Sequence, residues 1–245
     1  MSIPATREFG YWWHRYRRTW RGTAVISVAN PLLFVAALGF GLGQFVDARN
    51  GGSYLAFIGP GLLAASAMQM GFLNAAGPVF QSARTGGNYR AAVTTPMEPA
   101  DILTGHLLFT AFRALTDAGA ILLVLVTFGA VTLADAPRAL AGAVLTALAF
   151  AAPLSAYAVT AERPAQLTAV FRFVIMPLYM FSGTFFPTGQ LPGWLQKVVW
   201  FSPLWHGTEL CRGTGRAAIH LTVLLALTAA GYLAARRAYT RRLTA

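Results

Sequence analysis

Long stretches without a charged side chain decide what this chain can fold into. Between Arg21 and Asp47 lie 25 consecutive uncharged residues. Four more such stretches, of 34, 23, 24 and 19 residues, follow Arg49, Arg138, Arg172 and Arg216. A helix needs about 20 mostly apolar residues to cross a bilayer. Only 11% of the residues are charged, against about 25% in soluble domains, so the sequence predicts a polytopic membrane protein.

The predicted fold class is all-α integral membrane, with six transmembrane helices in a single domain. The spans are expected near 23–44, 55–78, 102–128, 137–158, 166–186 and 217–236. They divide the chain into an amphipathic helix (1–21), spans one to five (22–186), an outer hairpin (187–215), span six (216–236) and a tail (237–245). Pro31 and Pro177 predict kinks in the first and fifth spans, since proline removes a helical hydrogen bond.

The net charge of +11 indicates topology rather than nucleic-acid binding. The arginines cluster at the chain ends and in short loops between apolar runs, and they form no continuous basic stripe. If both termini are cytoplasmic, the inner segments hold 12 Lys or Arg residues and the outer loops hold five. By the positive-inside rule, we expect a multi-pass protein of the plasma or inner membrane with both termini in the cytoplasm.

The N-terminal segment predicts an amphipathic helix in the headgroup layer. Aromatic side chains recur at helical spacing on one face, and arginines occupy the other. The interfacial residues are Trp12, Trp13, Tyr16, Arg17 and Arg18. Such a helix either anchors the membrane domain or also acts as a lever that touches a cytoplasmic partner.

The longest inner loop, between spans two and three, contains a second candidate element. Tyr89–Thr94 can form a short helix that Pro96 and Pro99 would end. The loop is either a simple connection or a docking element parallel to the membrane.

Span three carries a line of polar residues within the membrane. His106, Thr110, Arg113 and Asp117 follow at spacings of four, three and four, which places them on one helical face. Arg113 and Asp117, one turn apart, can neutralise each other. The stripe is either a structural pairing or part of a substrate path or gate, because ionisable groups inside a membrane usually face the bundle interior or water. In span five, Arg172 is expected to extend toward the headgroups.

No enzymatic motif is found in the sequence. The single lysine, Lys197, follows Gln196 and so does not complete a phosphate-binding loop. The chain has no His-Glu-x-x-His zinc signature and no Gly-x-Ser-x-Gly elbow. We therefore expect no catalytic residues, metal or cofactor in this chain.

The outer segment after span five is too polar and too often interrupted by proline to span, but it is rich in tryptophan. Pro192 and Pro203 divide it into two short helices, near Gly193–Phe201 and Leu204–Cys211. Tryptophan at this depth predicts a re-entrant hairpin held at the interface. Its side chains form either a polar rim facing water or the roof of a lateral exit; the candidates are Trp194, Trp200, Trp205, His206 and Glu209.

The run MFSGTFFPTGQLPGWLQKVVWFSPLWHGTELCRG resembles the signature end of the ABC-2 family of exporter permeases. The similarity is greatest to the branch with the nodulation lipooligosaccharide and daunorubicin-resistance permeases. Two further segments agree: YLAFIGPGLLAASAMQMGF and TTPMEPADILTGHLLF. With the basic amphipathic start, the resemblance covers nearly the whole chain.

The resemblance implies an exporter subunit that moves an amphipathic drug, a lipid-linked sugar or a lipooligosaccharide-like molecule outward. It implies a second permease copy or close paralogue, membrane lipid around it, and two copies of a separate ATPase that bind ATP and Mg. The ATPase would dock on the loop helix, with Tyr89, Arg90 and Val93 as candidates, and on the N-terminal helix.

Two other classes fit part of the sequence. An ion-driven secondary transporter would use His106, Arg113 and Asp117 as a proton relay and would need no ATPase. An intramembrane enzyme acting on lipid-linked sugar would turn over without ATP and depend on His106. Neither needs the C-terminal signature.

Overall fold

The computed structural model describes residues 4–37, 54–84 and 87–244, and all regular secondary structure in these ranges is helical. Five helical segments are long and apolar enough to cross a membrane. They are α3 (Tyr54–Ala83), α5 (Pro99–Thr127), α6 (Ala136–Thr160), α11 (Ala217–Leu243) and the composite segment Pro164–Phe181. The predicted spans two to six are therefore confirmed as apolar helices, and the all-α class with them.

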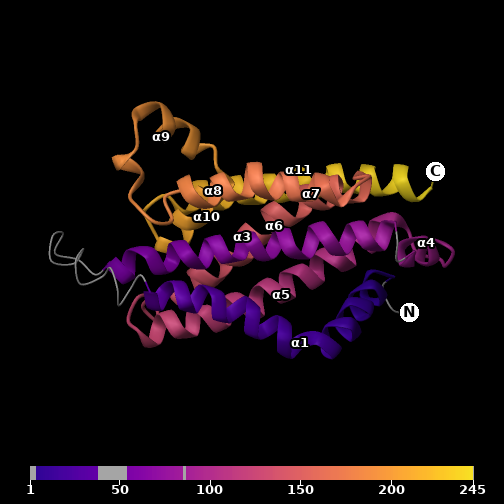
Figure 1. The fold of residues 1–245 in the computed structure, drawn as a ribbon, viewed down its shortest axis with the longest axis horizontal. Helices are drawn as coiled ribbons and strands as arrows, with labels where there is room; N and C mark the ends of the chain where they lie inside the picture. Colours follow the sequence, from indigo (N-terminus) through magenta and orange to yellow (C-terminus); the bar gives the residue numbers. More distant parts are fainter. Residues whose placement is uncertain (1–3, 38–53, 85–86, 245) are drawn as a thin grey trace.

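Helix α1 (Pro4–Ala36) differs from the expectation of a separate interfacial helix followed by a span. The two predicted elements form one continuous helix that passes through Asn30 and Pro31 and changes direction along its length (Figure 1). Residues 38–44 of the predicted first span lie outside the described residues.

The fifth apolar segment consists of three joined pieces: α7 (Pro164–Val170), the π-helical η2 (Phe171–Ile175) and α8 (Met176–Phe181). Pro177 lies in the first turn of α8. It has no N–H to bond backward, and a π-helical turn is one way in which a helix accommodates the lost bond. A kink was predicted at Pro177; the structure has a π-helical turn that ends two residues before it.

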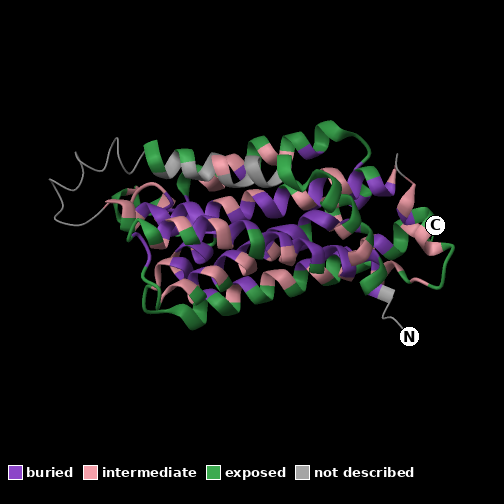
Figure 2. Cartoon of the chain, turned by 90° about the horizontal axis from the view of Figure 1, so that it is seen from below, coloured by how far each residue is buried: buried purple, intermediate pink, exposed green. Residues whose placement is uncertain are grey.

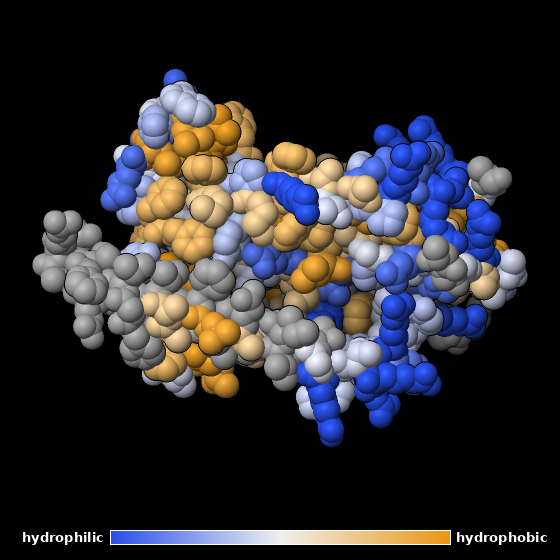
Figure 3. Space-filling model, viewed as in Figure 1, coloured by the Kyte–Doolittle hydropathy of each residue, from blue (hydrophilic) through white to orange (hydrophobic). Residues whose placement is uncertain are grey.

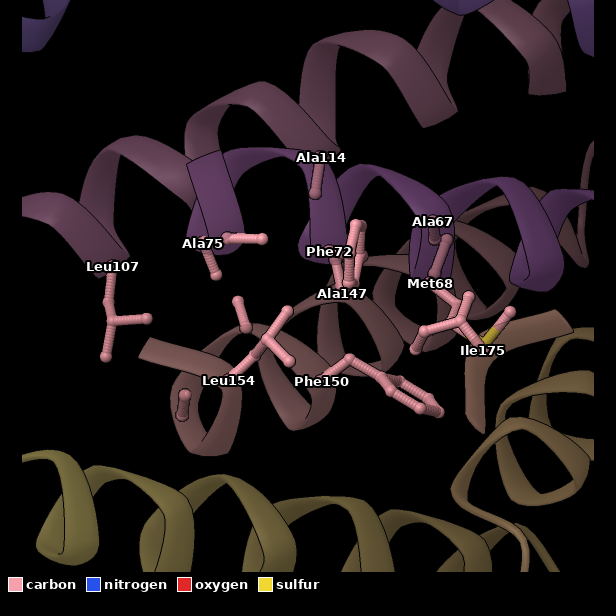
Figure 4. Packing of buried hydrophobic residues seen from close by; sticks show 14 of the residues in the cluster. Ala67, Met68, Phe72, Ala75, Leu107, Ala114, Ala147, Phe150, Leu154 and Ile175 are labelled. Carbon is pink, nitrogen blue, oxygen red and sulfur yellow. The ribbon is translucent and has the colours of Figure 1, made fainter. Parts of the chain in front are cut away.

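Helices α3 and α6 form the centre of the bundle, where the buried residues concentrate (Figure 2). Small residues allow close approach: a Cβ on Gly71 would meet the backbone carbonyl of Ala147. Phe72 of α3, Leu154 of α6 and Ile175 of η2 fill the space between the helices (Figure 4). Such small-residue packing is typical of membrane helices, whose association is not driven by water exclusion.

The bundle has two different ends. At one, here called the terminal end, lie both chain termini and α4 (Asn88–Val93) (Figure 1). At the other, the hairpin end, lie η3 (Thr188–Gln190), α9 (Gly193–Trp200) and α10 (Pro203–Arg212). Hydrophilic side chains gather at the terminal end (Figure 3), where Arg236, Arg237, Arg241 and Arg242 line two surface pockets.

Candidate functional site

The polar stripe of α5 lies on the buried face of that helix. His106, Thr110, Arg113 and Asp117 are each 6% exposed or less. Arg113 and Asp117 form an ion pair, with Nη2 and Oδ2 2.9 Å apart. His106 Nε2 lies 3.1 Å from the backbone oxygen of Asn74 in α3. The stripe therefore ties α5 into the bundle, and its two charges neutralise each other.

The first turns of α1 pack directly on this stripe rather than lying free in a headgroup layer. The ring of Trp12 is buried against His106, with ring centroids 4.8 Å apart. The ring of Tyr16 lies under the guanidinium of Arg113, at 4.3 Å from its centroid. The contact is close because Gly105 has no side chain: a Cβ there would lie 2.7 Å from the Cβ of Glu8. We call this contact between residues 5–16 of α1 and residues 105–117 of α5 the aromatic dock.

Of the other predicted interfacial residues, Trp13 is partly buried, with its ring centroid 5.3 Å from that of Phe112. Arg17 and Arg18 are exposed. The structure thus brings together two sets of residues that the sequence suggested separately, the tryptophans of α1 and the stripe of α5.

Glu8 belongs to the aromatic dock, and sequence reasoning missed it. Its carboxylate is buried and accepts a hydrogen bond from Trp12 Nε1 at 2.7 Å. Burial raises the pKa of Glu8 to about 7, and the bond from Trp12 opposes that shift. The spacing of four residues to Trp12, on the aromatic face, was the available signal.

Helix α4 presents its predicted docking residues in different ways. Tyr89 is fully buried, and its ring lies 5.7 Å from that of Tyr239 in α11. Its side chain therefore attaches α4 to the bundle and is not available to a partner at the surface. Arg90 is exposed and Val93 is partly exposed. The helix begins after Gly87, whose φ of 63° favours glycine.

At the hairpin end, two histidines from different helices meet. The Nδ1 atoms of His206 in α10 and His220 in α11 are 2.8 Å apart, and His206 Nε2 lies 3.0 Å from the backbone oxygen of Trp200. Only one of the two Nδ1 atoms carries the hydrogen in such a bond. Burial, followed by the proximity of His220, lowers the pKa of His206. The predicted second short helix thus carries His206 inward against the bundle.

A cavity of about 670 Å³ opens beside this histidine pair. We call it the hairpin cavity; its walls include Trp200, Trp205, His206, Glu209, Arg216 and His220. Four of the five predicted hairpin residues therefore share one space. Trp194 does not line it: that side chain is 69% exposed on α9. The volume is in the usual range for small-molecule sites.

Arg212 connects the elements around this end, and the sequence did not mark it. It forms an ion pair with Glu209 at 3.2 Å and donates to the backbone oxygens of Gly183 at 2.8 Å and Phe57 at 3.2 Å. One guanidinium thus joins α10, α3 and the segment after α8. Within the described ranges, no group of three or more His, Cys, Asp or Glu side chains is placed to hold a metal ion.

Comparison with known proteins agrees with this arrangement. The family described as ABC-2 type transporter matches residues 10–214. Nodulation protein J of Rhizobium meliloti (strain 1021) is 34% identical over 206 residues, covering 82% of this chain and 78% of the relative. Nodulation protein J of Sinorhizobium fredii (strain NBRC 101917 / NGR234) is 32% identical over 224 residues, covering 86% and 85%. Nodulation protein J of Bradyrhizobium diazoefficiens is 29% identical over 243 residues, covering 94% and 92%. No solved structure matches the chain.

The family match includes Trp12, Tyr16 and the polar stripe of the aromatic dock, and Trp200, Trp205, His206 and Glu209 of the hairpin cavity. The resemblance read from the C-terminal signature is confirmed. The chain belongs to the ABC-2 type transporter family and is a membrane permease similar to the nodulation exporter branch.

Proposed function

We propose that this chain is the transmembrane subunit of an ATP-driven exporter, energised by a separate ATPase present in two copies. The substrate is an amphipathic drug, a lipid-linked sugar or a lipooligosaccharide-like molecule. In this proposal α1 supplies a sixth span, the terminal end faces the cytoplasm, and a second permease copy or close paralogue completes the membrane part.

The observation that carries the proposal is the geometry of α4. This short helix lies at the terminal end between the apolar helices α3 and α5, and buried Tyr89 fixes it to α11. Arg90 is exposed, and its side chain has no hydrogen bond or ion pair with another described residue. The exposed cation suits docking in an acidic groove of an ATPase. Because α4 is held rigidly, a displacement of α4 by the ATPase would be transmitted directly to the long helices α3, α5 and α11.

The hairpin end supports the outward half of the proposal. The hairpin cavity is bounded by the short helices α9 and α10 and by the first turn of α11. Exposed aromatic side chains on α9, among them Trp194 and Trp200, suit an interface between water and lipid. A re-entrant hairpin of this kind would cover a lateral exit for an amphipathic molecule.

The test is purification of the tagged full-length chain in mild detergent from its native host, followed by an ATPase assay of what copurifies. We expect a nucleotide-hydrolysing partner with the wild type and its loss or uncoupling with Arg90→Glu. Lys197→Glu is the matched control, because it makes the same charge change at an exposed position of α9 at the other end. Equal ATPase recovery with both variants would refute docking on α4.

The ion-driven alternative receives less support. A proton relay needs connected water, but the cavity beside Asp117 measures about 10 Å³, room for about one water molecule. Arg113 and Asp117 are already paired. Transport by the purified chain without nucleotide would nevertheless favour that alternative and exclude the ATP-driven one.

A further inference from the structure

Arg172 lies near the middle of an apolar helical segment, and no described residue supplies its side chain with a counter-charge. It is the ninth of 18 residues in the apolar segment Pro164–Phe181. Eight residues at 1.5 Å each place it about 12 Å from the start of the segment. An extended arginine side chain reaches roughly 7 Å at standard bond lengths. Extension to the headgroups, expected from the predicted span 166–186, is therefore not favoured by the observed bounds.

The helix face that carries Arg172 is directed away from this chain's own bundle. Phe171 and Ile175 form the packed face: the ring of Phe171 lies 5.0 Å from that of Phe72, and Ile175 is 1% exposed. Arg172 is exposed, as is Thr168 one turn earlier. A hydrophilic area interrupts the apolar surface in the region of α7 and α8 (Figure 3).

Three other arginines form ion pairs with carboxylates, whereas Arg172 has no such partner among the described residues. Arg113 pairs with Asp117, Arg138 with Asp135, and Arg212 with Glu209. The side chain of Arg172 makes no hydrogen bond, ion pair or ring contact with another described residue. An unpaired charge facing lipid tails is strongly unfavourable, so intramembrane cations face protein partners or water.

Acidic side chains at this depth are scarce in the part of the chain that the structure describes. Within the described ranges, Asp117 alone lies in the middle of an apolar helix, and it pairs with Arg113. The other acidic residues in these ranges lie near helix ends or in connecting segments: Glu8, Glu98, Asp101, Asp135, Glu162 and Glu209. Water or a bound anion can neutralise Arg172 where these residues do not.

We propose that Arg172 and Thr168 line an aqueous path along α7 and η2, and that Arg172 binds an anionic group of the molecule that passes. A guanidinium pairs with carboxylate, sulfate or phosphate through two parallel hydrogen bonds. The π-helical turn at this position agrees with a functional role, since such turns occur frequently at functional sites. The inference rests on the proposed export function, and it adds that the exported molecule carries an anionic group.

Thiol accessibility tests the path without knowledge of the substrate. The only native cysteine, Cys211, is 1% exposed, and burial raises its pKa to about 12, so the wild-type chain gives a low background. Thr168→Cys and Arg172→Cys are compared with Leu225→Cys, a 48% exposed position on α11. The probes are the anionic reagent sulfonatoethyl methanethiosulfonate and its trimethylammonium analogue. Both are applied to membrane vesicles carrying the full-length complex, with and without ATP.

We expect both test positions to react at least tenfold faster than Leu225→Cys in one of the two nucleotide conditions. Rates equal to Leu225→Cys in both conditions would show that the face is covered by lipid or protein and would overturn the proposal. The same negative result is expected if Arg172 only extends its long side chain to a headgroup phosphate. In that case position 172 itself lies in lipid, and a shorter cysteine side chain there would not reach water.

Anion preference is read at Thr168→Cys, where Arg172 is intact. Each rate is first divided by the rate of the same reagent with a small free thiol, because a thiolate reacts intrinsically faster with the cationic reagent. On this normalised scale we expect the sulfonate to react about tenfold faster than the trimethylammonium reagent, since a focused local charge concentrates counter-ions by at least that factor. The ratio should fall toward one in Thr168→Cys/Arg172→Gln. An unchanged ratio would remove Arg172 as the anion-binding group. These readouts need no ATPase activity, so a copurifying ATPase with unreactive thiols would refute this inference and leave the export function standing.

Discussion

The aromatic dock and the hairpin cavity use similar residues in opposite ways. Both combine tryptophan, histidine and charged side chains. In the dock, Trp12 and Arg113 are almost fully buried, and the charged groups have partners inside the contact. At the hairpin cavity, Trp200 is 52% exposed and the polar groups border about 670 Å³ of open space. The closely packed dock is suited to transmitting movement from α1 to α5. The open hairpin cavity is suited to contacting substrates of different shape.

The two regions also respond to pH with opposite signs. Burial raises the pKa of Glu8 above that of a free carboxyl, so the dock is most stable when Glu8 is protonated. Burial lowers the pKa of His206, so the hairpin cavity is most stable when His206 is neutral. Acid therefore tightens the dock and loosens the cavity. Four predictions test this contrast, from the largest expected effect to the smallest.

Removal of one partner of the buried ion pair should have the largest effect. Asp117→Ala leaves Arg113 uncompensated, and breaking a buried pair in this way typically costs about 3–5 kcal/mol. The thermal midpoint in detergent, followed by size-exclusion fluorescence, should fall strongly. The double variant Arg113→Met/Asp117→Leu should recover most of the loss, because it removes both charges. No recovery would mean that the pair does more than neutralise charge.

The second effect is the pH dependence of the dock. The folded pKa of Glu8 is about 7 and its ordinary value is 4.5. At 1.36 kcal/mol per unit, the difference contributes about 3 kcal/mol that is fully present below pH 4.5 and lost as pH rises through 7. Hydrogen exchange of residues 5–16 should accelerate from pH 5 to pH 8, after correction for the intrinsic rate. Glu8→Gln should abolish that corrected change.

A matched exposed carboxylate provides the control for this experiment. Glu162 is exposed beyond α6, so Glu162→Gln should leave the response of residues 5–16 unchanged. If wild type and Glu8→Gln showed the same pH response, the carboxylate of Glu8 would not be the titrating group.

Close packing at Gly105 comes third. A methyl group there would contact Ala5 and Glu8, and overpacking of this kind costs about 1–3 kcal/mol. Gly105→Ala should therefore lower the thermal midpoint and separate α1 from α5. Gly10→Ala is the control: Gly10 lies on α1, the helix that packs on Gly105, and has nothing within 4 Å of its new Cβ. This substitution should be neutral or slightly stabilising, since alanine favours helix over glycine. Equal effects of the two substitutions would show that α1 does not pack as tightly as described.

The sequence determined the spans well because their signal is local. Runs of uncharged residues place α3, α6 and α11 to within a few residues, except that α11 extends to Leu243 beyond its predicted end. The mostly apolar character of 102–128 places α5 equally well, although Arg113 and Asp117 interrupt it. The four-residue spacing of Arg113 and Asp117 was likewise sufficient to predict their pairing.

Contacts that depend on tertiary arrangement were not predictable. Tyr89 was a docking candidate through the family resemblance, but its ring packs on that of Tyr239, 150 positions later. Arg212 reaches the backbone oxygen of Phe57 across 155 positions. No pattern within one helix indicates which distant helix will lie beside it. A single sequence, read without an alignment, carries no covariation between positions that would reveal such contacts.

The smallest expected effect is the pH response of the hairpin cavity. The neutral form of His206 is favoured in the fold, so its contribution is present above the ordinary histidine pKa of about 6.5 and is lost as pH falls below that value. Glu209 and Arg216 line the same cavity and shift the pKa of His220 in opposite directions, which limits the change.

The measurement uses Glu8→Gln, in which the opposing pH response of the dock is absent. Its thermal midpoint should fall modestly from pH 7.5 to pH 5.5, by less than the change that Glu8 produces. Adding His206→Gln should flatten this slope, whereas adding His14→Gln, at an exposed position of α1, should not. A slope that persists without His206 would assign the acid response to another group and remove the contrast between the two ends.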